Sequence, residues 1–337
     1  MIELSPGKLW GMRRMADAQG HFAMTAVDQR PPIKGPIAQH FGLDQAPWEA
    51  VADFKRLLVE TLQGPSTAML LDPHYAIPRA IDVLSPTKGL IVTLEDSLFE
   101  DTAGGRISNE IDDWSVAKIK RMGGDAVKVL AWYRPDADAG VAQKQKDFAK
   151  RVGEACAEHD IPYLFELLVY PFQGEKGYVE QADKTADHVL QSVETFAHAD
   201  YGVDVFKLES PVPAKRVAET DNVQSLFDEM GRLAGRPWVM LSAGAGKDDF
   251  ARIVEHACQA GASGYLAGRA IWLDAFSRYP DEKRMRVELE RDGVAYMQRL
   301  NGVVAAHAQP WHTHPCYGDD GARFPHADAS FRHGYTA

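Results

Sequence analysis

The chain has 337 residues, 45% hydrophobic and 25% charged, which is the balance of a globular protein and excludes a disordered one. Its 48 acidic and 37 basic residues give a net charge of −11, so its surface repels phosphate backbones and we expect no nucleic-acid partner. The three cysteines form no CxxC pair, and no apolar run is typical of a signal peptide or a membrane span. We therefore expect a cytoplasmic protein without membrane contact.

Eight short runs rich in β-branched, leucine and aromatic residues are predicted to be strands. Near-continuous apolar runs are typical of strands that are buried on both faces, as in a parallel sheet. The runs are Phe22–Arg30, Thr67–Pro73, Gly89–Asp96, Ala126–Tyr133, Pro162–Tyr170, Val203–Pro211, Pro237–Ala245 and Gly264–Trp272.

The segments between these runs show the 3.6-residue periodicity of amphipathic helices. The predicted helices are Trp48–Leu62, Val141–His159, Ala182–Ala197, Val223–Ala234 and Asp248–Ala260, with a brief helix at Pro78–Val83 between the second and third strands. Each strand is thus followed by room for a crossover to the next.

Eight β/α units within residues 22–275 predict an α/β protein with a closed (β/α)8 TIM barrel. No GxGxxG motif follows the first strand, which disfavours a dinucleotide-binding doubly wound sheet. Residues 5–19 are expected to form a helix capping the barrel floor. A long helix at Glu282–His307 and an irregular tail should complete one domain over residues 1–337, with the barrel at about 20–275 and the extension at about 280–337.

Three charged side chains are predicted to point into the barrel from successive strands. The two-residue period of a strand puts Lys207 on the face of Val205, and Glu166 and Lys128 on the inner faces of their own strands. Burial, and a second lysine nearby, should lower the pKa of Lys207. An uncharged amine can condense with a ketone to give a Schiff base, and Glu166 could then act as general acid and base. The alternative is that Lys207 and Glu166 form a buried ion pair with a purely structural role.

Two glycine-containing loops follow the last two strands, at Leu241–Asp249 and Tyr265–Trp272. Such loops often bind phosphate in barrels of this kind. The candidate ligands are Ser242, Gly244, Gly246, Gly268 and Arg269. The alternative is that the glycines only permit tight turns. For the strand-end carboxylates Asp28 and Asp72, a loop-capping role and a chemical role both remain open.

Five of the twelve histidines fall in the last 31 residues: His307, His312, His314, His326 and His333. We expect a solvated tail or a subunit contact there rather than a metal site. The barrel mouth lacks the imidazole and thiolate ligands that a zinc-dependent aldolase needs. Cys156 and Cys258 lie on apolar helix faces and should be packing residues.

The segments AVDQR, LLDP, VKVLAWY, FELLVY, VDVFKLESP, LSAGA and GYLAGRAIW together resemble the tagatose 1,6-bisphosphate aldolase family of class I aldolases. That family includes the 6-deoxy-6-sulfofructose-1-phosphate aldolases, and the likeness covers residues 20–275. The resemblance implies that Lys207 forms the Schiff base, that Glu166 is the acid/base, and that Lys128, Asp28 and Gln29 accompany them. It also implies that Ser242, Gly268 and Arg269 bind phosphate.

Three loops depart from the family pattern: Arg30-Pro31-Pro32, His74–Pro78 and Tyr170–Gln173. These loops, Arg30 among them, should touch the far end of the sugar, so the group at carbon six is left open as phosphate, sulfonate or an uncharged group.

The expected activity is cleavage of a ketose 1-phosphate to dihydroxyacetone phosphate and an aldehyde, with no cofactor and no metal. The phosphorylated ketose is the expected partner, and we expect a homo-oligomer. Two alternatives remain: a Mg²⁺-dependent, enolase-like lyase using Glu95, Glu166 and Glu209, and a non-catalytic sugar-phosphate sensor.

Overall fold

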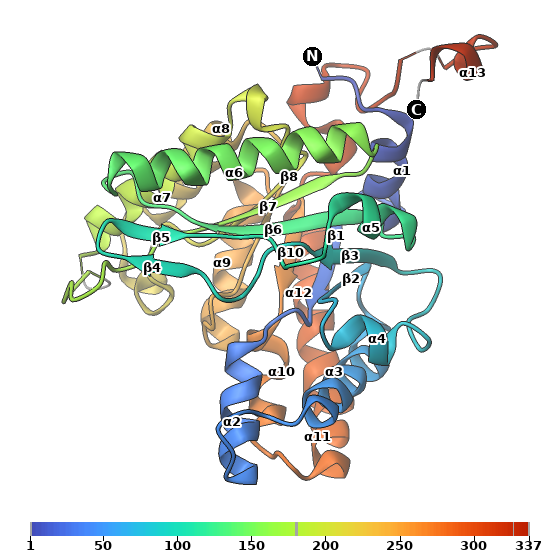
Figure 1. Cartoon of the computed structure of the whole chain (residues 1–337). Helices are drawn as coiled ribbons and strands as arrows, with labels where there is room; N and C mark the ends of the chain where they lie inside the picture. The colour runs from blue at the N-terminus through green and yellow to red at the C-terminus, as the bar shows by residue number, and fades with distance from the viewer. Residues whose placement is uncertain (1, 179–180, 326, 336–337) are drawn as a thin grey trace.

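The computed structural model describes residues 2–178, 181–325 and 327–335, and its centre is a closed barrel of eight parallel strands (Figure 1). Around the barrel the strands follow the order β1-β10-β9-β8-β7-β6-β3-β2. Their bounds are β1 Phe22–Ala26, β2 Ala68–Leu71, β3 Gly89–Thr93, β6 Ala126–Trp132, β7 Tyr163–Leu168, β8 Val205–Leu208, β9 Trp238–Met240 and β10 Gly264–Ala267. The predicted TIM barrel is confirmed, and each strand lies within one of the eight apolar runs.

Helices cover the outside of the barrel; most connect one strand to the next, and those after residue 268 follow the last strand, β10. The longer ones are α2 Pro31–Phe41, α3 Trp48–Leu62, α6 Ala139–Glu158, α7 Ala182–Phe196, α8 Val223–Ala234, α9 Lys247–Gln259, α10 Arg269–Phe276 and α12 Val294–His307. Short helices are α4 Ala76–Ala80, α5 Val116–Arg121 and α11 Glu282–Glu288. A π-helical turn at Leu289–Gly293 joins α11 to α12, so the predicted helix Glu282–His307 is continuous apart from this turn. Within the described residues, no helix is long and apolar enough to cross a membrane.

The strand register sets neighbouring charged side chains at one level of the barrel. Glu166 of β7 is the register partner of Lys207 in β8, and Leu130 of β6 pairs with Glu166. Below them, Leu164 and Val205 belong to an apolar cluster that fills the lower barrel. The odd–even alternation predicted from the sequence is therefore confirmed, with an apolar floor and charged residues above it.

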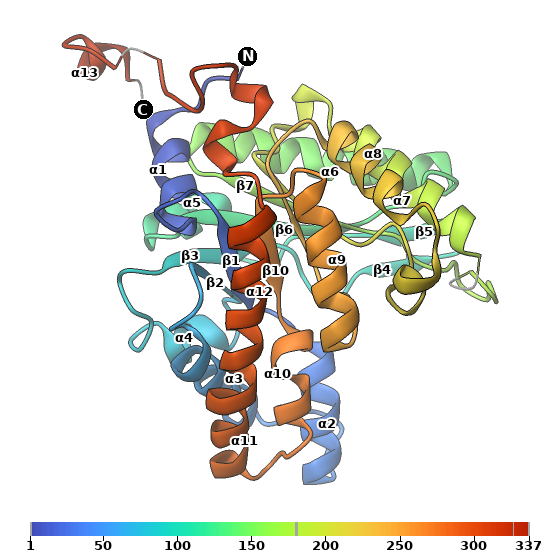
Figure 2. The same cartoon turned by 180° about the vertical axis from the view of Figure 1, so that it is seen from behind.

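The floor is covered by one segment near each end of the chain, and these two segments lie side by side in Figures 1 and 2. Helix α1 (Pro6–Met15) packs there, shorter than the predicted 5–19. Trp311 and Tyr317 of the tail are each 2% exposed and join the same apolar cluster. The expectation of a solvated tail is thus wrong for residues around 311–317, because these two aromatic rings cover the lower end of the barrel. His314 is also buried, which lowers its pKa to about 4. His326 lies outside the described residues.

The structure differs from the prediction in four places. The run Gly264–Trp272 is not one strand, because α10 begins at Arg269, two residues after β10 ends. Helices α2 and α5 were not predicted. Nor was the antiparallel hairpin of β4 (Glu100–Thr102) and β5 (Gly105–Ile107), which lies in the long connection after β3.

Candidate active site

A cavity of about 340 Å³ opens among the loops that follow the strands. Among its lining residues are seven of the ten predicted site residues: Asp28, Gln29, Arg30, Lys128, Glu166, Lys207 and Arg269. We call this the mouth cavity. The polar strand ends therefore converge as the barrel topology predicts.

Lys128 is the centre of a buried network of carboxylates. Its Nζ lies 3.0 Å from Asp28 Oδ2, 2.6 Å from Glu95 Oε1 and 2.8 Å from Glu166 Oε2. Burial disfavours the ammonium, but the attraction of these carboxylates outweighs it and raises the pKa of Lys128 well above its ordinary value. Lys128 is therefore a fixed positive charge, only 2% exposed.

Lys207 has fewer contacts of this kind. Its Nζ lies 2.9 Å from Glu166 Oε2, and Glu166 is its ion-pair partner among the described residues. Lys207 is 4% exposed, and its side chain lines the mouth cavity. A lysine, a glutamate within hydrogen-bond reach and a space for a ligand are the parts that covalent imine chemistry requires.

The pKa values of the carboxyl groups in this network shift in opposite directions. Burial tends to raise the pKa of both Asp28 and Glu166, but the ammonium groups of Lys128 and Lys207 lower both below their ordinary values. For Glu95, burial prevails over Lys128 and Arg30, and its pKa is raised. Asp28 and Glu166 are therefore anions near neutral pH, as a general base must be.

Several buried polar atoms face the mouth cavity without a hydrogen-bond partner among the described residues. They include Asp28 Oδ1, Gln29 Oε1, Glu95 Oε2 and two nitrogens of Arg30, Nε and Nη1. Arg30 is 4% exposed and is held by a hydrogen bond from Nη2 to the carbonyl of Glu95. Leaving buried donors and acceptors unpaired costs free energy, so these atoms indicate a polar ligand.

Asp72 has the capping role that the sequence left open. Its Oδ1 accepts hydrogen bonds from the backbone N–H groups of His74 and Tyr75, and its Oδ2 forms a buried ion pair with Lys55. Asp28, by contrast, bonds to Lys128 inside the mouth. The two strand-end aspartates thus have different surroundings, and only Asp28 reaches the cavity.

The two glycine loops meet above the mouth. A Cβ added to Gly244 would lie 3.6 Å from Cζ of Arg269, and one added to Gly268 would lie 2.7 Å from Nε2 of Gln29. Ala243 and Gly244 both have positive φ, 45° and 83°, a strained conformation for alanine that is common at binding sites. Helix α10 begins here without a side-chain cap or an acidic residue in its first turn, so its N-terminus favours an anion.

A second cavity of about 590 Å³ lies beside the first, lined in part by Ser242, Gly244 and Gly246. Glu209 also lines it and accepts a hydrogen bond from the Val169 N–H at 2.6 Å. Burial, reinforced by the charge of Glu166, raises the pKa of Glu209 to about 8. Since Gly244 approaches Arg269, the two cavities adjoin at the glycine loops.

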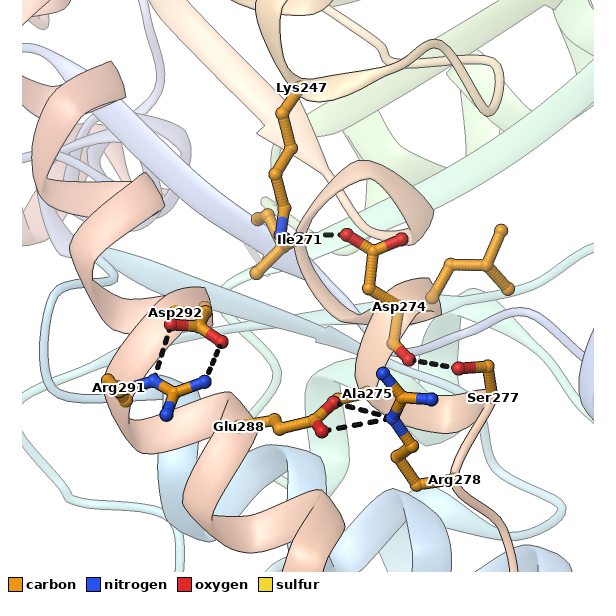
Figure 3. A pocket seen from close by; sticks show the side chains of 11 residues that line it. Lys247, Ile271, Asp274, Ala275, Ser277, Arg278, Glu288, Arg291 and Asp292 are labelled. Carbon is orange, nitrogen blue, oxygen red and sulfur yellow. Dashed lines mark hydrogen bonds and ion pairs between the residues drawn. The ribbon is translucent and has the colours of Figure 1, made fainter.

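A third hollow, of about 470 Å³, lies away from these residues, between α10 and the helix that starts with α11 (Figure 3). Its charges neutralise one another in pairs: Lys247 with Asp274 at 2.8 Å, Arg278 with Glu288 at 2.9 Å, and Arg291 with Asp292 at 2.7 Å. Its charged side chains are paired with one another within the described part of the chain, so the mouth cavity is the candidate active site.

Part of the site was not predicted from the sequence. Glu95 was considered only as a metal ligand, although its position at the end of a strand was a sufficient signal. Phe99 and Trp132 also line the mouth cavity. Phe99 lies in the unpredicted connection after β3, so no local pattern could have placed it there.

The arrangement does not favour the magnesium alternative. Glu95 and Glu166 both contact the Lys128 ammonium, and Glu209 faces the second cavity. Over the described ranges, no cluster of three or more histidine, cysteine, aspartate or glutamate residues is arranged to hold a metal ion.

The known proteins that this chain resembles are aldolases. The family model described as DeoC/LacD family aldolase matches residues 22–274. The tagatose 1,6-diphosphate aldolase of Listeria monocytogenes serotype 4a is 33% identical over 327 residues, which are 93% of this chain and 96% of that protein. Tagatose 1,6-diphosphate aldolase 2 of Enterococcus faecalis is 31% identical, with 93% and 98% covered.

Solved structures show the same fold. Fructose-bisphosphate aldolase from Plasmodium falciparum superposes with a TM-score of 0.67 at 10% identity, covering 91% of this chain and 98% of that one. An archaeal fructose 1,6-bisphosphate aldolase gives a TM-score of 0.58 at 18% identity, covering 88% and 98%.

Proposed function

The chain belongs to the DeoC/LacD aldolase family, whose members are lyases, and on this basis we propose that it is a class I aldolase acting on a ketose 1-phosphate. Its products would be dihydroxyacetone phosphate and an aldehyde. The observation that carries the proposal is the buried contact between Lys207 Nζ and Glu166 Oε2 at 2.9 Å, on the wall of the mouth cavity.

The reaction uses Lys207 as its nucleophile. The uncharged amine attacks C2 of the ketose and, with loss of water, gives an iminium ion. Glu166 takes the proton of the C4 hydroxyl, the C3–C4 bond breaks, and the bonding electrons move onto the iminium to give an enamine. Protonation at C3 and hydrolysis then release dihydroxyacetone phosphate and restore the amine of Lys207.

Lys128 and Asp28 support these steps. The permanent charge of Lys128 keeps Glu166 ionised between turnovers. Asp28 Oδ1, buried and without a partner among the described residues, is suited to accept a hydrogen bond from a sugar hydroxyl. Gln29 and Arg30 direct further unpaired atoms at the same space.

The C1 phosphate is assigned to the meeting point of the glycine loops. Arg269 supplies a planar, permanently charged guanidinium, and the α10 N-terminus adds a favourable dipole. Ser242, Gly244 and Gly268 lie around this point, where the absence of a side chain on each glycine lets the phosphate approach the backbone. Helix α9 is less suitable, because Asp248 and Asp249 occupy its first turn.

Borohydride trapping tests the proposal. Incubation of the protein with dihydroxyacetone phosphate and borohydride should add a reduced three-carbon phosphate to the peptide that contains Lys207. Lys128→Ala is the comparison variant, because it removes the other lysine that lines the mouth cavity and leaves Lys207 in place. An adduct on Lys128, or none on either lysine while the activity survives, would contradict the imine route.

A panel of candidate sugars identifies the substrate. Tagatose and fructose 1,6-bisphosphates and 6-deoxy-6-sulfofructose 1-phosphate are the candidates, assayed for release of triose phosphate. The cytoplasm remains our proposed location, and the three cysteines, all unpaired, suit a reducing compartment.

A further inference from the structure

An arginine on the hairpin of β4 and β5 is held in a cage of aromatic rings. The guanidinium carbon of Arg106 lies 4.3 Å from the ring centroid of Phe99, 4.6 Å from that of Trp132 and 4.7 Å from that of Tyr170. The Tyr170 hydroxyl also accepts a hydrogen bond from the Arg106 backbone N–H at 2.7 Å. Ring faces attract a cation and fix its plane, so the guanidinium is positioned before any ligand binds.

The charge of Arg106 is poorly compensated. Within the described ranges its ion-pair partner is Asp101, at 3.8 Å from Nε, which is too far for a hydrogen bond. The Nε atom is buried and has no hydrogen-bond partner there. Burial also lowers the pKa of Arg106. With its side chain 18% exposed, the guanidinium is largely desolvated yet accessible to an anion.

The cage adjoins the mouth cavity. Phe99 and Trp132 line both the cage and the cavity, and Ser108, two residues after Arg106 in an extended segment, lines the cavity as well. Trp132 ends β6, which is the fourth strand from β10 in either direction around the closed barrel. Arg269, directly after β10, is therefore across the mouth from the cage, with Lys207 of β8 midway along the wall.

We propose that Arg106 binds an anionic group, phosphate or sulfonate, at carbon six of the ketose. This inference rests on the proposed function, in which Arg269 takes the C1 phosphate. A ketose with an anion at each end spans the mouth from one arginine to the other and lays its C2 carbonyl beside Lys207. Arg106 is thus a specificity-determining residue.

The test compares substrates that differ only at carbon six. Arg106→Ala and Arg106→Lys are assayed with a ketose 1,6-bisphosphate, its 6-deoxy-6-sulfo analogue and the corresponding ketose 1-phosphate with a free C6 hydroxyl. Losing a hydrogen-bonded charge should cut kcat/KM about 10- to 100-fold for the two doubly anionic substrates, mainly through KM. The ketose 1-phosphate should change by less than about threefold, and the lysine variant should lie between, because it lacks the planar fork.

Arg151→Ala is the control, since this arginine lies on the exposed surface of α6 with 61% of its side chain accessible. It should leave all three substrates unchanged. An equal loss for all three substrates in Arg106→Ala would assign Arg106 a structural role and overturn the inference, as would no loss at all. Cleavage of no substrate by the wild type, without a borohydride adduct, would instead refute the proposed function. Of the two doubly anionic substrates, the one with the higher kcat/KM in the wild type identifies the group at carbon six.

Discussion

Replacing Lys128 by methionine tests whether one buried ammonium compensates the carboxylates of the mouth. In Lys128→Met, Glu166 still has an ion pair with Lys207, at 2.9 Å, and Glu95 still has one with Arg30, at 3.9 Å. Asp28 keeps only the Thr93 hydroxyl, at 3.3 Å, among the hydrogen bonds of the described residues. One carboxylate is then buried without a charge partner in contact, which costs about 3–5 kcal/mol of stability at neutral pH.

The sign of the pH dependence follows from the same contacts. In the wild type the pKa of Asp28 is lowered, so its contribution is present above the unfolded pKa and is lost only as the pH falls through the folded value. In the variant, burial without the ammonium raises this pKa above the unfolded value, and the folded state takes up a proton. The deficit of the variant should therefore be smaller at pH 5 than at pH 8, by about 1.4 kcal/mol for each unit by which the raised pKa exceeds 5.

Urea titrations at pH 5 and pH 8, followed by tryptophan fluorescence, measure the deficit. Lys8→Met is the matched control, because Lys8 forms a mostly buried ion pair with Asp204, at 2.7 Å, at a distance from the mouth. The control should lose stability and keep aldol cleavage, whereas Lys128→Met should lose both. A deficit that is the same at both pH values would refute the role assigned to Lys128.

Other substitutions address the imine, the phosphate and a buried acid. Lys207→Met should abolish both cleavage and borohydride trapping, while Glu166→Gln should slow turnover about 10²- to 10⁴-fold and still trap on long incubation; normal turnover in either contradicts the mechanism. Arg269→Ala should raise KM for a ketose 1-phosphate at least about tenfold without changing the unfolding midpoint, and an unchanged KM would move the phosphate elsewhere. Burial raises the pKa of Glu209 to about 8, so the wild type should lose stability as the pH rises from about 4.5 to 8. Glu209→Gln should remove this loss. Urea titrations at pH 5 and pH 9 that give both proteins the same change in the free energy of unfolding would disprove it.

The barrel could be predicted because each parallel strand is buried on both faces and therefore appears as a continuous apolar run. The ends of the strands could not be predicted in the same way. Helix α10 continues the apolar pattern of β10 without a break in composition, and the change of conformation occurs at Gly268. That residue has no side chain, and the close approach of Ala26 O and Gln29 leaves no room for one. This contact exists only in the folded barrel.

Helix α2 and the hairpin of β4 and β5 escaped prediction for different reasons. Pro31 and Pro32 suggest a loop, yet proline is tolerated in the first turn of a helix, where its missing N–H costs nothing. The hairpin is short and polar, and contacts from elsewhere hold it. The stacking of Arg106 on Trp132 and Tyr170 joins it to strand ends 26 and 64 residues further along the chain. Such distant contacts leave no local pattern.

The two lysines of the mouth cavity show what the sequence contains and what it leaves open. The two-residue period of the strands puts Lys128 and Lys207 on the inner wall, but it does not indicate which of the two is the nucleophile. Their neighbours differ, because Lys128 contacts three carboxylates and Lys207 contacts Glu166. The Lys128 ammonium, whose pKa is raised well above its ordinary value by these neighbours, keeps its proton and cannot attack a carbonyl. In the proposed mechanism, Asp28 and Glu95 thus leave Lys207 as the nucleophile, because their carboxyl groups hold the Lys128 ammonium.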